Sequence, residues 1–230
     1  MALCIASPAE DQASGTSIVL CFDHLISDDP MLCELSFRDD ASLAPCFAVM
    51  VAGDIEDSTY LIQFCKHRLS GSATFDSVKE QLWQGMQDFK RALAGIGRDH
   101  SDAQLLVLGF IENEPMIIYL DEQGPVASQA FLAIGPGGAA ADAMLTWRKL
   151  TRHTPLDEAI YYLYEAKRIA EAFPLVGKST TILTMQNHPE KPFVVCRLSE
   201  DCIEQLSNQF EKIGPQSYFS ESPFLWKPLL

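Results

Sequence analysis

The stretch that decides the fold runs from Phe131 to Gly177 and reads FLAIGPGGAAADAMLTWRKLTRHTPLDEAIYYLYEAKRIAEAFPLVG. A short apolar run meets a glycine turn, and two helical segments follow, separated by Thr154 and Pro155. In the second segment, apolar residues recur at helical spacing and form a wide stripe: Leu156, Ala159, Ile160, Leu163, Ala166, Ala170 and Phe173. The pattern predicts strand, turn, helix, helix, strand, which favours a helical layer laid across a sheet.

Two short signals inside this stretch have local interpretations. Thr154 is placed to cap the second helix, Pro155 suits the first helical position, and Asp157 lies where a capping box has its acceptor. The turn Gly135–Gly138 lacks the lysine and Ser/Thr of a P-loop and the spacing of a dinucleotide fingerprint. We therefore interpret it as a tight strand-to-helix turn.

Working outward, the apolar pattern predicts the other elements of the chain. Strands are expected over residues 1–6, 16–22, 31–38, 46–52, 104–111, 115–120, 126–134, 180–185 and 192–198, and further helices over 54–69, 76–93 and 199–213. The polar segment 7–15 is expected to be the loop of a hairpin. Strands followed by a helix pair occur twice, which predicts an α+β fold with two sheets faced by two helical layers, a four-layer αββα sandwich.

The chain of 230 residues, 47% of them hydrophobic, fits one large domain over 1–230. Its core is expected over about 1–213, and the tail 214–230 is expected to dock on this chain or on a neighbouring subunit, because it carries several aromatic residues: Tyr218, Phe219, Phe224 and Trp226. A net charge of −14 argues against nucleic acid and anionic membranes as partners. No run approaches the roughly 18 apolar residues of a spanning helix.

Cysteine usage favours a reducing compartment. The seven cysteines form no CxxC pair, and most lie in apolar runs, which predicts buried free thiols: Cys4, Cys21, Cys33, Cys46, Cys65, Cys196 and Cys202. The segment Met1–Ala9 lacks the basic start and long apolar core of a signal peptide, so a cytoplasmic location is expected.

Other residues that suggest chemistry have simpler explanations. The five histidines are scattered without i, i+4 pairs on a helix, so no metal site is assigned, and no cofactor is expected. The pairs Asp28–Asp29 and Asp39–Asp40 fit turn chemistry. Trp83 and Trp147 lie in helical stretches and are interpreted as packing residues.

Four segments, taken in order and with their spacing, carry a resemblance to a known family. They are the run Ser17–Asp23, the strand-to-helix step Phe47–Gly53, the hairpin Leu106–Tyr119, and the step Phe131–Gly138 with the helix start Leu156–Ala159. Together they resemble proteasome β-type subunits and their bacterial relatives, which are N-terminal nucleophile (Ntn) hydrolases. The resemblance covers residues 1 to 197 and implies an αββα fold whose subunits pack into stacked rings.

The resemblance also implies a site. In the family, the first residue of the mature chain is the nucleophile, its α-amine can act as the base, and a lysine, an aspartate and a glycine amide assist it. Asp23 and Gly53 match the aspartate and the glycine. The nucleophile position falls on Met1 or Ala2, which have neither hydroxyl nor thiol. The lysine is expected near Cys33 or Glu34, but no lysine precedes Lys66.

Two further departures and two rival nucleophiles complete this picture. Arg38 lies near the lysine position, but a guanidinium does not give up its proton. The later acid-and-serine element is expected near Phe173–Gly177, which offers neither. Gly15–Thr16 resembles the junction at which proteasome precursors cleave themselves, which makes Thr16 a rival nucleophile, although the missing lysine and the poor spacing count against it. Cys4 is a further rival, which requires removal of three residues.

These observations lead to three hypotheses. The first is a proteasome-β-like subunit that has lost peptidase activity and assembles with itself, in a stacked ring, or with related subunits; Ala2, Asp23 and Gly53 are then vestigial. The second is an active threonine peptidase or amidase that matures at Gly15–Thr16. The third is a ligand-binding protein that uses the vestigial cleft around Asp23 and Gly53. The sequence identifies no unfoldase partner.

Overall fold

The structure is a computed structural model, and it describes residues 3–11, 15–23, 33–35, 47–69, 74–128, 130–188 and 193–214. In these residues the chain forms ten strands and five helices. The strands lie in two antiparallel sheets of five strands each. The predicted α+β class is therefore confirmed as a mixed fold with two antiparallel sheets.

The first sheet has the strand order β10-β9-β2-β1-β8. Its strands are β1 (Cys4–Asp11), β2 (Gly15–Phe22), β8 (Leu132–Ile134), β9 (Thr181–Gln186) and β10 (Val194–Arg197). The hairpin of β1 and β2 pairs Cys4 with Phe22 at one end and Asp11 with Gly15 at the other. Because β8 pairs with Cys4–Ala6, β1 is an interior strand of this sheet.

The second sheet has the strand order β3-β4-β5-β6-β7. Its strands are β3 (Cys33–Leu35), β4 (Phe47–Ala52), β5 (Gln104–Ile111), β6 (Glu114–Asp121) and β7 (Gly124–Ser128). The β5–β6 turn has two residues, Glu112 and Asn113, both with positive φ. Two successive left-handed residues match the right-handed twist of an antiparallel hairpin.

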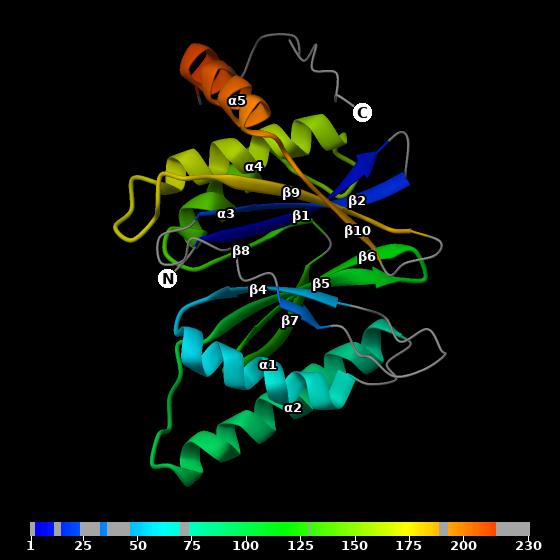
Figure 1. The fold of residues 1–230 in the computed structure, drawn as a ribbon, viewed down its shortest axis with the longest axis vertical. Coiled ribbons are helices and arrows are strands. Elements are labelled where there is room, and N and C mark those ends of the chain that lie inside the picture. Colours follow the sequence, from blue (N-terminus) through cyan, green and yellow to red (C-terminus); the bar gives the residue numbers. More distant parts are fainter. Residues whose placement is uncertain are drawn as a thin grey trace.

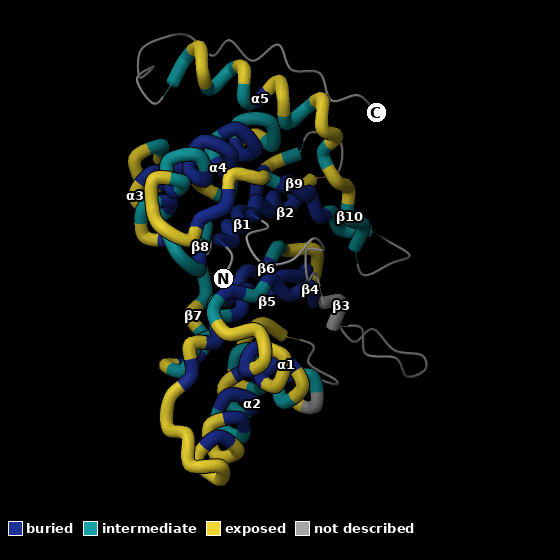
Figure 2. Tube along the Cα trace, turned by 60° about the vertical axis from the view of Figure 1, so that its left-hand side comes forward, coloured by how far each residue is buried: buried dark blue, intermediate teal, exposed yellow. Residues whose placement is uncertain are grey.

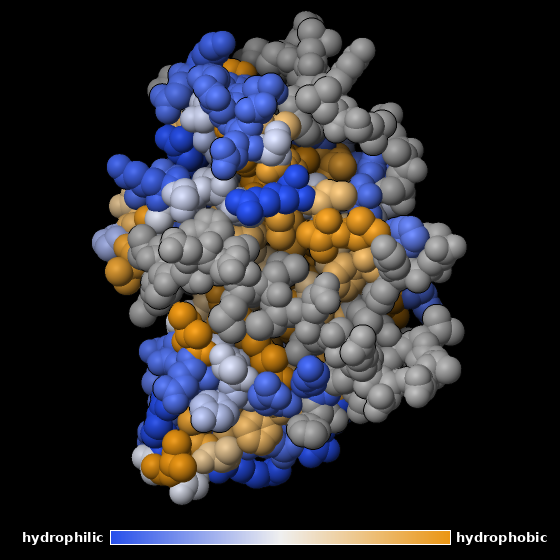
Figure 3. All heavy atoms as spheres, viewed as in Figure 1, coloured by the Kyte–Doolittle hydropathy of each residue, from blue (hydrophilic) through white to orange (hydrophobic). Residues whose placement is uncertain are grey.

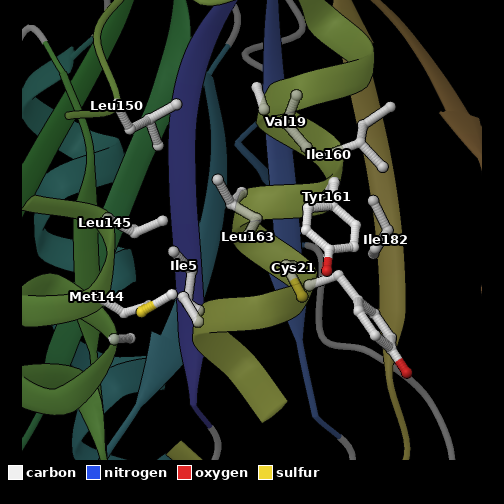
Figure 4. Packing of buried hydrophobic residues seen from close by; sticks show 14 of the residues in the cluster. Ile5, Val19, Cys21, Met144, Leu145, Leu150, Ile160, Tyr161, Leu163 and Ile182 are labelled. Atoms are coloured by element: carbon white, nitrogen blue, oxygen red, sulfur yellow. The ribbon is translucent and has the colours of Figure 1, made fainter. Parts of the chain in front are cut away.

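One helix pair covers the outer face of each sheet, as Figure 1 shows. Helices α3 (Gly138–Trp147) and α4 (Leu156–Ala170) pack on the first sheet, and α5 (Glu200–Ile213) lies against α4. Helices α1 (Ile55–Leu69) and α2 (Phe75–Gly95) pack on the second sheet. A third apolar cluster, which includes Leu20 and Leu108, fills the space between the two sheets. Figure 4 shows how Ile160 and Leu163 of α4 lie over Val19 and Cys21 of β2.

The predicted strand over 126–134 is wrong in one respect, because the chain changes sheets within it. Residues 124–128 form β7 at the edge of the second sheet, and residues 132–134 form β8 at the edge of the first. The hydroxyl of Ser128 accepts hydrogen bonds from the amides of Ala130 and Phe131, and so ends β7 with a turn. An apolar run alone does not indicate which sheet its residues join.

The predicted loop over 7–15 is also too long. Strand β1 continues to Asp11, with Ser7 and Ala9 buried. The Ser7 hydroxyl lies 2.8 Å from two carbonyl oxygens, those of Pro8 and Ala130, so the polar side chain has partners in the interior. Pairing with β8 ends at Ala6, so among the described residues Pro8 has a strand neighbour on one side only, where a missing amide is tolerated.

The predicted cap of the helix at 156 is wrong as well. Pro155 occupies the N-cap position of α4, which has no side-chain cap. The Thr154 hydroxyl instead accepts a hydrogen bond from the amide of Thr151, within the loop before the helix. The turn Gly135–Gly138 is a tight strand-to-helix turn as expected, with Gly137 in the left-handed conformation at the N-cap of α3.

The cysteines and tryptophans are only in part as predicted. Cys4, Cys21 and Cys65 are buried free thiols, whereas Cys196 is exposed and Cys202 half-buried. Trp83 packs over Gly124, where an added Cβ would lie 2.4 Å from the ring. Met1, Ala2, the aspartate pairs at 28–29 and 39–40, Arg38, Cys46 and the tail 215–230 lie outside the described residues. No helix in the described part combines the length and apolar character that crossing a membrane requires.

Candidate functional site

The predicted site residues Asp23 and Gly53 lie at one end of the two-sheet body. Asp23 directly follows β2, opposite the start of β1, and its amide donates to the carbonyl oxygen of Leu3. Gly53 directly follows β4. Two contacts join the sheets at this end: the thiol of Cys4 lies 3.6 Å from the carbonyl oxygen of Val51, and the amide of Gly135 donates to the side chain of Gln104 at 3.0 Å.

The carboxylate of Asp23 is buried and engaged by the backbone. Only 2% of the residue is exposed. Its Oδ1 accepts a hydrogen bond from the amide of Leu3 at 3.1 Å, and its Oδ2 accepts one from the amide of Gly177 at 2.5 Å. Backbone donors of this kind stabilise a buried carboxylate without a cationic partner. Asp23 therefore ties the start of β1 to the connection between α4 and β9.

Gly53 is required by its surroundings. Its φ is +85°, and an added Cβ would lie 1.8 Å from the carbonyl oxygen of Asp102. A left-handed conformation and a backbone contact this close both demand glycine. The position of Gly53 thus has a structural explanation that needs no bound substrate.

Cys4 is the thiol nearest to this end, and it is poorly suited to act as a nucleophile. Its side chain is buried between the sheets, and burial raises the pKa of the Cys4 thiol strongly, with the negative charge of Asp23 adding to the shift. Because the thiolate is the nucleophilic form, a raised pKa suppresses reactivity.

Thr16 lies at the other end of the same strand. It pairs with Glu10 near the tip of the β1–β2 hairpin, while Asp23 follows the opposite end of β2. Seven residues of extended chain separate the two, a distance of about 24 Å. The structure therefore brings Asp23 and Gly53 to one end of the molecule and separates Thr16 from them.

Sequence reasoning missed one partner of Asp23 and one buried cation in the helix that covers β2. The first is the amide of Gly177, because a backbone donor leaves no side-chain signature in the sequence. The second is Lys167 of α4, which is fully buried and forms an ion pair with Glu171. Lys167 interrupts the apolar stripe between Leu163 and Ala170, and a charged residue at such a position was the available signal.

Lys167 influences the pKa of Cys21, which lies two residues before Asp23. Burial raises the pKa of Cys21 to about 12, the charge of Lys167 opposes this shift, and the charges of Asp23 and Glu171 add to it. Cys21 belongs to the cluster between α4 and the first sheet. The helix layer thus places a cation and a carboxylate near the residue that precedes Asp23 by two positions.

Ala2, the predicted vestigial nucleophile position, and Met1 lie outside the described residues. The position of the expected lysine falls on β3, where the side chains are not described. The segment 173–177 has neither acid nor serine, and what it offers to the site is the Gly177 amide. The described partners of the Asp23 carboxylate are two backbone amides, those of Leu3 and Gly177.

Comparison with known proteins finds a likeness in fold alone. No family model matches the sequence, and no curated protein matches it. Among solved structures, Anbu (ancestral beta-subunit) from Yersinia bercovieri is 14% identical, with a TM-score of 0.67 over 96% of this chain and 99% of that chain. A Gly-1 mutant of Anbu from Hyphomicrobium sp. strain MC1 is also 14% identical, with a TM-score of 0.66 over the same shares.

This result corrects the family assignment drawn from the sequence segments. Those segments resemble proteasome β-type subunits with a degenerate active site, but the full sequence matches no family model. The similarity to the two Anbu structures is one of fold, at 14% identity. Short apolar runs ending in aspartate or glycine recur in many sheets, so their order indicates the fold but not the family.

Proposed function

We propose that this chain is a non-proteolytic subunit that assembles with copies of itself, on the Anbu-like, proteasome-related fold described above. Its layers form a four-layer αββα sandwich in which one helix pair covers each sheet. The single observation that carries the proposal is the state of Asp23, whose two carboxylate oxygens accept hydrogen bonds from the amides of Leu3 and Gly177. This arrangement stabilises the fold and leaves Asp23 no oxygen free of backbone contact.

Maturation at Thr16 is disfavoured by the architecture of the first sheet. Cleavage between Gly15 and Thr16 would remove β1, which lies between β2 and β8. The loss would expose both neighbouring strands and remove several core residues, including Leu3 and Ile5. At about 2–5 kcal/mol for each large core side chain, the summed loss is comparable to the whole stability of a typical domain, about 5–15 kcal/mol.

Self-assembly is supported by apolar groups on the surface. Strand β10 is an edge of the first sheet, with Val194 and Val195 half-buried and Cys196 exposed. Figure 3 shows hydrophobic side chains gathered on this face between α5 and the second sheet. Phe173 and Leu175, beside Gly177, are 49% and 55% exposed. Edge strands and apolar loops of this kind are commonly covered in assemblies.

The buried free thiols of Cys4 and Cys21 suit a cytoplasmic location.

Three measurements on the full chain test the proposal together. Intact mass measures processing, native mass measures assembly, and incubation with peptide substrates and an electrophilic threonine-directed probe measures hydrolase chemistry. We expect a chain that keeps Thr16 internal, a mass that is a multiple of one chain, and no covalent adduct. A single-chain native mass at micromolar concentration would remove the assembly half of the proposal.

Two variants locate any activity that appears. Thr16→Ala removes the rival hydroxyl at the start of β2, and Cys4→Ala removes the thiol near Asp23. If the wild-type chain turns over peptide and Thr16→Ala does not, the chain is an active hydrolase and the proposal is wrong. If both variants are as silent as the wild-type chain while remaining folded, the non-proteolytic assignment stands.

A further inference from the structure

The loop of residues 98–103, between α2 and β5, forms the wall behind Gly53. Its carbonyl group at Asp102 is the one that excludes a side chain at Gly53. Figure 2 shows this connection as a largely exposed run that returns from α2 toward the second sheet. An exposed loop holds a tight backbone contact only if it is fastened, so its attachments determine how firmly the wall is kept in place.

The first attachment is an ion pair whose charges do not change near neutral pH. Arg98 forms two hydrogen bonds with the buried carboxylate of Asp57, in the first turn of α1, at 2.8 and 2.7 Å. Burial on its own would raise the pKa of Asp57, but hydrogen bonds from Arg98 and Ser101 outweigh it and lower the pKa. Both partners therefore stay charged from weakly acidic to alkaline pH.

The second attachment passes through a histidine between two carboxylates. Nδ1 of His100 lies 2.8 Å from Oε2 of Glu122, in the β6–β7 turn, and Nε2 lies 3.1 Å from Oδ1 of Asp102. Lys90 of α2 donates to the carbonyl oxygen of Glu122, and Asp99 borders the same small cavity as His100. His100 thus connects the β6–β7 turn to Asp102, whose carbonyl group packs against Gly53.

We propose that His100 is a pH-sensitive brace that fastens the 98–103 loop behind Gly53. Doubly protonated imidazole donates to Glu122 and Asp102 at once. Neutral imidazole has one N–H, so its other nitrogen presents a lone pair to a carboxylate and that contact is lost. The brace acts on the wall of the candidate site whether or not the chain has peptidase activity, so it goes beyond the proposed function.

The direction of the response follows from the surrounding charges. A hydrogen bond from Glu122 and its charge raise the pKa of His100, with Asp102 contributing in the same direction. A raised pKa in the folded state means that the stabilisation is complete below about pH 6.5, the ordinary histidine value. It is lost as the pH rises through the folded-state value. The loop is therefore braced below the folded-state pKa of His100 and released above it.

Hydrogen–deuterium exchange measured by mass spectrometry tests this on the full chain in any assembly state. Exchange at pH 6 and pH 8 is corrected for the intrinsic pH dependence of the chemistry. We expect the peptides that contain Gly53 and residues 98–104 to lose protection several-fold at pH 8. In His100→Gln the two pH values should give equal corrected rates in these peptides.

His153→Gln is the matched control, because His153 pairs with Glu10 on an exposed surface remote from this loop. It should retain the wild-type response at Gly53. The proposal is overturned if the wild-type peptides show no pH dependence, or if the dependence persists in His100→Gln. Should His100→Gln unfold, Glu122→Gln removes one charged acceptor and must weaken the response for the proposal to hold.

Discussion

The two helix–sheet interfaces of the molecule use different chemistry. In α4, which packs on the first sheet, two charged residues of the C-terminal half, Glu165 and Lys167, are completely buried. Among the described residues of α1 and α2, the buried charged residue is Asp57, which lies at a helix start beside the half-exposed Arg98. Otherwise the face of α1 and α2 toward the second sheet is apolar, from Leu61 to Leu93.

This difference shows which helix layer is held in one fixed geometry. Apolar contacts are non-directional and tolerate small shifts, whereas a buried ion pair is satisfied in one geometry only. Arg148 at the end of α3 grips Glu165 of α4 with two bonds of 2.6 and 2.5 Å, and its guanidinium lies 5.1 and 5.2 Å from the Trp147 and Tyr162 rings. Helix α4 leads to Gly177, which holds Asp23. Helix α4, whose position is fixed by buried ion pairs, is therefore the helix that leads to the candidate site.

The largest effect is expected where the second sheet depends on close backbone approach. Gly53→Ala should lower the free energy of unfolding by about 3–5 kcal/mol, because the Cβ would lie 1.8 Å from Asp102 and something must move. Gly15→Ala is the control, since Gly15 has a φ of +87° and open space around it. That variant should cost only about 1–2 kcal/mol of left-handed strain. Equal losses in denaturant titrations would show that strain alone explains Gly53.

The next largest loss of stability is expected when one member of the buried Arg148–Glu165 pair, in the helix layer on the first sheet, is removed. Glu165→Ala leaves the guanidinium of Arg148 among aromatic rings without its anion, and should cost about 3 kcal/mol. Asp88→Ala is the control in the helix layer on the second sheet, where Asp88 forms ion pairs with the exposed Arg68 and Arg91. It should cost less than about 1 kcal/mol. Similar losses for the two variants would contradict the distinction between the interfaces.

Lys167→Met should change the free energy of unfolding by no more than about 1 kcal/mol. Methionine fills the space of the lysine stem, and Glu171, which is partly exposed, still has Arg168 at 3.3 Å. The lost ion pair and the removed cost of burying an ammonium nearly cancel. A loss as large as that of Glu165→Ala would mean that Lys167 stabilises more than Glu171, with Asp23 as the first candidate.

The sequence predicted the regular parts of this fold because periodicity reports burial. The apolar stripes of α2 and α4 and most strands appear where hydrophobic spacing placed them. The change of sheet between Ser128 and Leu132 was missed, because periodicity does not say which neighbours a strand has. The cap at Pro155 was missed because Thr154 found a partner inside its own loop.

The candidate site was predicted to a lesser extent. Asp23 and Gly53, which the sequence nominated only through its resemblance to Ntn hydrolases, follow β2 and β4 at one end of the body, and their role in a site stays a prediction. The partners of Asp23 are backbone amides brought together from residues 3 and 177, and no sequence pattern marks a backbone donor. The family assignment failed for a related reason, because short segments encode layers of structure more strongly than ancestry.

The smallest change in stability is expected at Asp142 of α3, in the helix layer on the first sheet. Oδ1 of Asp142 in α3 is buried and receives no hydrogen bond. Burial raises the pKa of Asp142, against a hydrogen bond from the backbone of Ala133 that lowers it. A raised carboxyl pKa means that the charged form destabilises the fold above that pKa. Asp142→Asn should therefore raise Tm at pH 7 by about 1–2 °C. The gain should vanish at pH 3, where Asp142 is itself neutral. A gain that persists in acid would trace it to packing, and a lower Tm at pH 7 would mean that an undescribed cation partner stabilises the charge.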